Sequence, residues 1–179
     1  RGIHSAMRLK LAYTRLAVVS VVLVSLVGCD QATKQLAMSR LRGGQPRTYC
    51  GDVLRLEYAE NPGAFLGLGT DMPPWARRAL LVAANAGVTL AILGAVALRQ
   101  SVSPLSLCTW ALLAAGAIGN LIDRLRYDGL VVDFLNVGIG PLRTGIFNVA
   151  DMAITAAAIL LIWGGLGTTA AAAPKPQAR

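Results

Sequence analysis

The chain has 179 residues, of which 55% are hydrophobic and only 15% are charged, and its mean hydropathy is +0.56. A soluble domain carries about a quarter charged residues, so this composition excludes an ordinary soluble enzyme, a disordered tail and a disulfide scaffold. The formal net charge of +8 is typical of membrane-surface attraction, and we expect no nucleic-acid partner. The composition is that of a small integral membrane protein.

The side chains available for chemistry are restricted. The single histidine, His4, precedes the first methionine, Met7, and we leave residues 1–6 out of the fold reasoning as a cloning remnant. Without an imidazole, Ser–His–Asp catalysis, Cys–His catalysis and the HExxH metal site are excluded. The cysteines form neither a disulfide framework nor a metal knuckle, since they are odd in number and widely spaced: Cys29, Cys50 and Cys108. We expect neither a metal nor a cofactor.

Four apolar stretches are long enough, or nearly so, to cross a membrane. A hydrocarbon core of roughly 30 Å needs about 20 apolar residues in a helix, and backbone groups in lipid must be satisfied within the segment. We therefore predict a mostly α-helical membrane domain over 7–167 and a frayed tail over 168–179. Its four spans are expected at 13–38, 79–98, 104–122 and 147–166. The second span is interrupted by Asn85 and Thr89.

Polar segments separate the spans. In the segment 39–75, apolar residues alternate with polar ones around Leu56, which is the period of a half-buried strand. Asn61-Pro62-Gly63 then indicates a turn. A second β-prone run covers 129–134, between the third and fourth spans.

Charge placement separates the two sides of the membrane. The N-terminal stretch, the loop at Arg99 and the tail carry seven basic residues and no acid, whereas the other side carries ten basic residues and all nine acids. By number of Lys and Arg the positive-inside rule is not cleanly obeyed, and Arg77 and Arg78 oppose our assignment. We still place both termini in the cytoplasm, because basic residues before the first helix usually dominate orientation.

Charged groups at the ends of apolar helices often mark function. Asp30 and Lys34 are one turn apart on one helix face, which also fits an ion pair that tethers the helix end at the interface. Asn120, Asp123 and Arg124 share a face of the third span, where a salt bridge that caps the helix is the alternative.

Two further aspartates lie where solvent is scarce. Asp133 stands inside the apolar run Val131–Phe134, and Asp151 begins the long apolar run of the last span. Capping of the helix N-terminus is the alternative role for Asp151. A loop that folds back would bring the two carboxylates together in a water-poor pocket, where they would share one proton. Such a pair can activate water for attack on an amide without histidine or metal.

Taken in this order, the motifs resemble those of the lipoprotein signal peptidases, the type II signal peptidases that are bacterial membrane aspartic proteases. The resemblance rests on five segments: Asp30-Gln31-Ala32-Thr33-Lys34, Asn61-Pro62-Gly63-Ala64-Phe65, Gly119-Asn120-Leu121-Ile122-Asp123-Arg124, Val132-Asp133-Phe134 and Phe147-Asn148-Val149-Ala150-Asp151. Many family members read Asn-x-Gly-Ala-Ala-Phe, so Phe65 comes one residue early here.

The resemblance implies four transmembrane helices, cytoplasmic termini and a small β-sheet cradle outside the inner membrane. It implies cleavage of diacylglyceryl-modified prolipoproteins before the lipidated cysteine, and inhibition by the cyclic peptide globomycin. It makes Asp133 and Asp151 the catalytic pair. The positions that match substrate-orienting or supporting residues are Asn120, Arg124, Asn148, Asn61, Gly63, Asp30, Lys34 and Asp123.

Two alternatives remain. The segment Leu26-Val27-Gly28-Cys29 matches a lipobox, so the chain could itself be a lipoprotein, although three further spans follow it. A small transporter or channel is the other alternative, but it would need acids along the membrane depth. Here all nine acids are assigned to one side.

Overall fold

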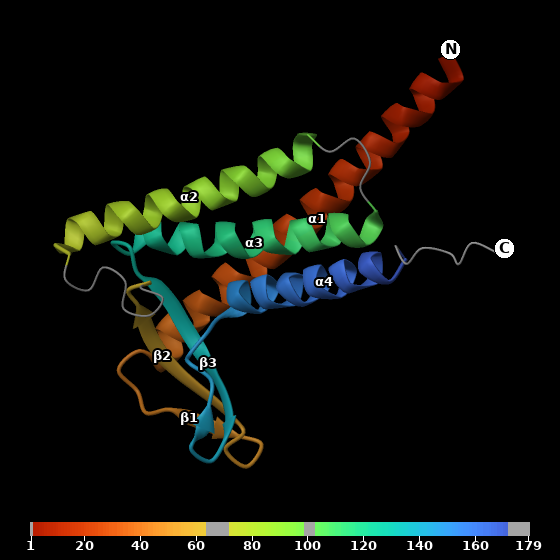
Figure 1. Cartoon of the computed structure of the whole chain (residues 1–179). Coiled ribbons are helices and arrows are strands. Elements are labelled where there is room, and N and C mark those ends of the chain that lie inside the picture. Colours follow the sequence, from red (N-terminus) through yellow and green to blue (C-terminus); the bar gives the residue numbers. More distant parts are fainter. Residues whose placement is uncertain (1, 64–71, 99–102, 172–179) are drawn as a thin grey trace.

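The computed structural model describes residues 2–63, 72–98 and 103–171, which form four helices and a small sheet (Figure 1). The helices are α1 (Gly2–Leu41), α2 (Pro74–Leu98), α3 (Pro104–Arg126) and α4 (Val149–Ala171). Three of them contain segments long and apolar enough to cross a membrane, namely Leu16–Leu41, Pro74–Ala95 and Pro104–Arg126. The apolar segment of α4, Val149–Trp163, is shorter. The predicted mostly helical membrane fold is confirmed.

The helices extend beyond the apolar runs from which they were predicted. The second begins at Pro74 rather than at residue 79, and the third ends at Arg126 rather than at residue 122. Hydropathy detects only the part of a helix that is suited to lipid, whereas hydrogen bonding continues through the polar turns beyond it. The start of α3 follows local chemistry: Ser103 Oγ accepts a hydrogen bond from Ser106 N (3.1 Å), and Pro104 stands in the first turn.

The sheet is antiparallel, in the order β1 (Arg47–Tyr49), β2 (Leu54–Asn61), β3 (Val131–Ile139) and β4 (Leu142–Arg143). Its central pair joins the segment after α1 to the segment after α3. Leu54 pairs with Val137 at one end and Asn61 with Val131 at the other, with an irregularity between Leu56 and Ala59. The register pairs Ala59 with Asp133, so it brings the end of β2 beside that carboxylate.

Helix α3 is the centre of the bundle and packs against α1, α2 and α4. Its buried face consists largely of small residues, which allow helices to approach closely in a membrane: Ala111, Ala114, Ala115, Gly116, Ala117 and Gly119. The sheet lies at the end of the bundle where α1 and α3 finish and α2 and α4 begin (Figure 1). The start of α1 and the end of α4 lie at the opposite end.

Candidate active site

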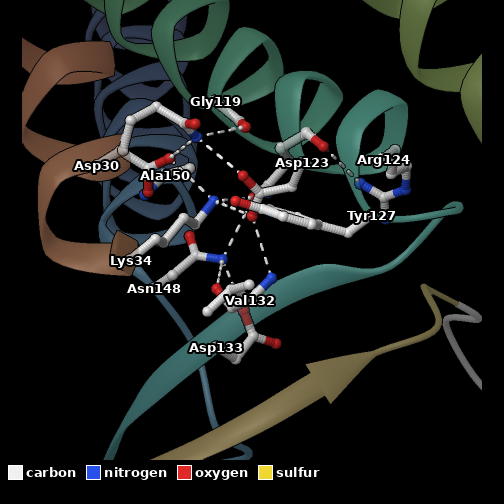
Figure 2. Close-up of polar contacts among 12 residues, drawn as sticks. Asp30, Lys34, Gly119, Asp123, Arg124, Tyr127, Val132, Asp133, Asn148 and Ala150 are labelled. Carbon is white, nitrogen blue, oxygen red and sulfur yellow. Dashed lines mark hydrogen bonds and ion pairs between the residues drawn. The ribbon is translucent and has the colours of Figure 1, made fainter. Parts of the chain in front are cut away.

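Four aspartates from four elements meet where the bundle joins the sheet. Asp30 comes from α1, Asp123 from α3, Asp133 from β3 and Asp151 from the first turn of α4. The close-up in Figure 2 includes three of them, with Lys34 and Asn148 between them. The aspartates form two pairs with different surroundings.

Asp133 lies in a buried run of β3 and is only 2% exposed. Its Oδ1 accepts a hydrogen bond from Asn148 Nδ2 at 2.6 Å, and its Oδ2 accepts one from Asn61 Nδ2 at 2.9 Å. Asn61 reaches it because it is the last residue of β2, the strand that pairs with β3. The carboxylate is therefore held by two amides.

Asp151 caps α4 and also belongs to the site. Its Oδ2 accepts from the backbone N of Asn148 (3.2 Å), while Asn148 Oδ1 accepts from the backbone N of Asp151 (3.0 Å). This reciprocal pair satisfies free N–H groups at the helix start. The other oxygen, Oδ1, accepts from Asn120 Nδ2 at 2.9 Å. The capping role considered from the sequence is present, and the second oxygen remains directed at α3.

Asn148 connects the two carboxylates. Its side chain has no exposed surface, and its Nδ2 lies near Asn120 Oδ1 (3.2 Å) and Val132 O (3.3 Å) as well as Asp133. Among the described residues, neither Asp133 nor Asp151 forms an ion pair. Both carboxylates are thus surrounded by amides and lack a direct cationic partner.

The pKa of Asp133 is raised from its usual 3.8 to about 6, mainly by burial and in smaller part by the negative charge of Asp151. The hydrogen bonds from Asn61 and Asn148 act in the opposite direction, because they stabilise the carboxylate, but they do not offset the burial. A carboxyl group with this pKa exchanges its proton close to neutral pH, as a general acid or base must.

Asp30 and Asp123 share one lysine. The Nζ of Lys34 lies 2.9 Å from Asp30 Oδ2 and 3.0 Å from Asp123 Oδ2, and the three side chains are almost wholly buried. The predicted pairing of Asp30 with Lys34 is present, but it lies inside the protein rather than at an exposed helix end. Asp123 pairs with Lys34 and not with Arg124, so the cap alternative for Asp123 and Arg124 does not apply.

Backbone groups complete this buried cluster. Asp30 Oδ1 accepts from Ala150 N (2.9 Å), and Asp123 Oδ2 accepts from Val132 N (3.0 Å). Lys34 Nζ also donates to Asn120 Oδ1 at 3.1 Å. The cluster therefore ties α1 and α3 to the starts of β3 and α4, the two elements that carry Asp133 and Asp151.

The sequence analysis assigned no role to Gln31 or Gly119. Gln31 Nε2 donates to Asp123 Oδ1 (2.9 Å) and lies 3.2 Å from both Asp30 Oδ2 and Gly119 O. A Cβ on Gly119 would lie 2.7 Å from Asp30 Oδ2, so only glycine fits there without a shift. Both residues belong to the motif segments given above. Their spacing in the sequence does not show whether they contact a buried acid or face lipid.

The guanidinium of Arg124 lies against Gly63. Gly63 has a φ of +79°, its N donates to Asn61 Oδ1 at 2.8 Å, and a Cβ there would lie 2.7 Å from Arg124 Nη2. The Nε of Arg124 is buried and has no hydrogen-bond partner among the described residues. Phe65, considered in the sequence analysis, lies outside the described residues.

Two cavities adjoin this group. One of about 600 Å³ borders Asp151, and its walls come from the segment before α4 and from one face of that helix: Thr144, Gly145, Ile146, Phe147, Met152, Thr155, Ala156 and Ile159. A second, of about 300 Å³, borders Asn120 and Arg124 between α2, α3 and α4. Within the described part of the chain, no group of three or more His, Cys, Asp or Glu side chains could hold a metal ion.

Comparisons with known proteins identify related sequences and structures. A family model described as signal peptidase (SPase) II matches residues 22–166. The lipoprotein signal peptidase of Moorella thermoacetica is 37% identical over 134 residues, which are 75% of this chain and 83% of the relative. That of Bifidobacterium longum is 36% identical over 154 residues, covering 83% and 78% of the two chains.

Solved structures of bacterial membrane enzymes share the fold. One superposes with a TM-score of 0.74 at 24% identity and covers 90% of this chain and 95% of its own. Another superposes with a TM-score of 0.73 at 26% identity and covers 84% and 93%.

Proposed function

Because the chain belongs to the signal peptidase II family of membrane proteases, we propose that it cleaves diacylglyceryl-modified prolipoproteins by an aspartic mechanism in which Asp133 and Asp151 are the catalytic pair. The observation that carries the proposal is the bridge through Asn148, which binds Asp133 through its side chain and Asp151 through its backbone N. Asp151 also borders a cavity. Asp133 is thus buried, whereas Asp151 can be reached from the cavity.

The pair shares one proton. The carboxylate that is ionised takes a proton from a water molecule, whose oxygen attacks the scissile carbonyl carbon, while the protonated partner donates to the carbonyl oxygen. When the tetrahedral intermediate collapses, the C–N bond breaks. The aspartate that took the proton from water donates it to the leaving amine of the lipidated cysteine, and the other aspartate takes a proton from a hydroxyl of the intermediate, which restores the pair. The amides of Asn61, Asn120 and Asn148 hold the carboxylates in place, so that little reorganisation is needed during the reaction.

Arg124 and Gly63 serve the substrate backbone. The buried Nε of Arg124 lacks a partner among the described residues and is a donor that a substrate carbonyl can use. The small residue at position 63 lets the guanidinium lie against the chain that follows β2. The signal-peptide helix lies beside the bundle, the diacylglyceryl chains remain in lipid or in an apolar groove, and the sheet clamps the extended cleavage region.

The basic residues before the first span support the orientation that we propose. Both termini are in the cytoplasm, and the sheet and the aspartates lie near the outer face of the bacterial inner membrane, where lipidated precursors emerge. Globomycin, a cyclic peptide, binds at the pair as a substrate mimic would.

The test uses the full chain in detergent and a lipidated prolipoprotein. The wild type should convert the precursor to a species lighter by the signal peptide, and globomycin should stop the conversion. Asp133→Asn and Asp151→Asn should each lower kcat/KM by about 10²- to 10⁴-fold, while the thermal midpoint shows that each variant is still folded at the assay temperature. Asp128→Asn is the matched control, since Asp128 is an exposed acid paired with Arg78 at the same end of the bundle. Substantial activity in either dyad variant removes the dyad assignment.

The lipobox alternative makes a different prediction. Cleavage before Cys29 would remove the part of α1 that precedes Cys29. Asp30, whose carboxylate accepts a hydrogen bond from Ala150 N of α4, would become the second residue. Intact-mass measurement of the membrane-extracted protein distinguishes the two readings. An acylated N-terminus at Cys29 would make the chain a lipoprotein. The transporter alternative is disfavoured because Asp30, Asp123, Asp133 and Asp151 gather at one end of the bundle instead of along it.

A further inference from the structure

Helix α2 stands at the edge of the bundle and carries a polar residue in its apolar segment. Among the described helices and strands it packs only against α3. Asn85 and Thr89 lie on it one turn apart, and both are at least partly buried. A polar side chain within a membrane span is costly unless a partner satisfies it, so each of these residues requires an explanation.

Thr89 is explained by its own helix. Its hydroxyl donates to the backbone oxygen of Asn85 at 2.8 Å, an i−4 contact that needs nothing from another element. Thr89 is 5% exposed and fills the interface with α3. Its role is local.

Asn85 reaches across to α3. In the amide orientation that satisfies both ends, Nδ2 donates to Ala117 O at 3.0 Å and Oδ1 accepts from Arg124 Nη1 at 3.2 Å. The first bond joins two helices. The second holds the guanidinium that we have assigned to the substrate backbone.

Arg124 has few other restraints. Its Nη1 lies 3.5 Å from Asn120 O, its Nη2 lies against Gly63, and its Nε has no partner among the described residues. An arginine presents its donors in a rigid planar fork, so fixing one nitrogen fixes the direction of the others. The side-chain oxygen of Asn85, on α2, accepts from this guanidinium and so fixes its direction.

We propose that Asn85 is a positioning residue, which holds Arg124 so that its remaining donors face the substrate. The inference rests on the proposed function, and it extends the site to a helix that carries none of the motif residues. Asn85, Asn120 and Arg124 border the same cavity of about 300 Å³. A displacement of about 1 Å in such a group can lower a rate by about 10²-fold.

Two substitutions separate positioning from helix packing. Asn85→Leu removes both bonds, whereas Asn85→Asp keeps an acceptor for Arg124 and loses the donor to Ala117 O. We expect Asn85→Leu to lower kcat/KM by about 10- to 100-fold and Asn85→Asp to stay within about fivefold of wild type. Leu90→Ala, a control at an exposed position of the same helix, should retain wild-type kcat/KM. Equal losses in the Leu and Asp variants would assign Asn85 to helix packing and overturn the proposal.

A double-variant cycle with Arg124→Gln completes the test. If Asn85 acts through Arg124, Asn85→Leu should cost little further activity once Arg124 is replaced. The same loss in both backgrounds would overturn the proposal. If the wild type leaves the lipidated precursor uncut, the proposed function fails. In that case the contact between Asn85 and Arg124 is tested by the thermal midpoints of wild type, the two single variants and the double variant. Shifts that do not add support the contact, and shifts that add refute it.

Discussion

Two pairs of aspartates meet at the same end of this bundle, and they differ in what faces them. Asp30 and Asp123 have the ammonium group of Lys34 within 3.0 Å, together with two backbone N–H donors. Both carboxylates contact the one ammonium group, and the three side chains are almost wholly buried. It has the properties of a structural joint between α1, α3 and the starts of β3 and α4.

Asp133 and Asp151 accept hydrogen bonds from the side-chain amides of asparagines, whereas Asp30 and Asp123 face the ammonium group of Lys34. Amide donors fix the direction of a carboxylate without neutralising it, so the negative charges of the two groups oppose each other. Burial is the largest cause of the raised pKa of Asp133, about 6, and the negative charge of Asp151 acts in the same direction. The comparison teaches that aspartates at the same end of one bundle can have different partners: a lysine and backbone N–H groups for Asp30 and Asp123, and side-chain amides for Asp133 and Asp151.

The two pairs are also connected. Lys34 donates to Asn120 Oδ1, which leaves Asn120 Nδ2 to face Asp151. An amide can present its oxygen or its nitrogen to a neighbour, and the ammonium selects one of the two orientations. The cluster of Asp30, Asp123 and Lys34 thus orients the amide of Asn120, which donates to Asp151.

The largest expected effect comes from removing the cation. Lys34→Met leaves Asp30 and Asp123 buried without a counter-charge, which should destabilise the fold by about 3–5 kcal/mol. The measurement is the thermal midpoint of the purified protein in detergent. The triple variant Lys34→Met, Asp30→Asn, Asp123→Asn removes the whole ionic cluster and should recover much of the loss. A single Lys34→Met variant as stable as wild type would contradict the structural role of the cluster.

The next effect concerns the pH dependence of stability. Because the pKa of Asp133 is raised in the folded state from 3.8 to about 6, folding favours its protonated form. The stability from this group is complete below about pH 4 and is lost as pH rises through about 6, a loss of up to about 3 kcal/mol. Asp133→Asn cannot ionise, so its thermal midpoint relative to wild type should rise between pH 4 and pH 7.

Asp128→Asn supplies the baseline for this measurement. Asp128 is exposed and paired with Arg78, so its substitution measures how much the loss of a surface acid changes the midpoint at each pH. If the gap between Asp133→Asn and wild type is the same at pH 4 and pH 7, the raised pKa is refuted.

The sequence predicted the helices well, because a run of apolar residues has few alternatives in a membrane. It also marked Asp133 and Asp151, since an acid within an apolar run needs a reason. The helix ends at Pro74 and Arg126 were missed because hydropathy falls where the helix leaves lipid, although the backbone hydrogen bonds continue.

The connections between motifs could not be predicted from spacing. Asp30 and Lys34 are adjacent on one helix, but their shared contact with Asp123 depends on how closely α1 and α3 approach. That approach depends on Gly119, whose lack of a side chain has no periodic signal. Asn85 appeared only as an interruption of an apolar run, because its partner Arg124 is on another helix. Each of these contacts joins residues that are far apart in the sequence, so rules based on local spacing could not predict them.

The smallest expected effect comes from a substitution at Gly119, which packs against Asp30. Alanine at position 119 would place its Cβ 2.7 Å from Asp30 Oδ2 and 3.2 Å from the Cβ of Ala150. We expect Gly119→Ala to destabilise the protein by about 1–3 kcal/mol, measured as a lower thermal midpoint. Gly28→Ala is the matched control, because nothing lies within 4 Å of its added Cβ, and better helix propensity should raise stability by up to about 1 kcal/mol.

The same variant also connects packing to activity. Asp30 holds both Lys34 and the start of α4, so a shift of its carboxylate should reach Asp151 through Asn120 and Ala150. Gly119→Ala should therefore lower kcat/KM at temperatures well below its own unfolding midpoint, whereas Gly28→Ala should not. If Gly119→Ala loses stability while it keeps wild-type kcat/KM, the two pairs are independent, and the connection through Asn120 is structural only.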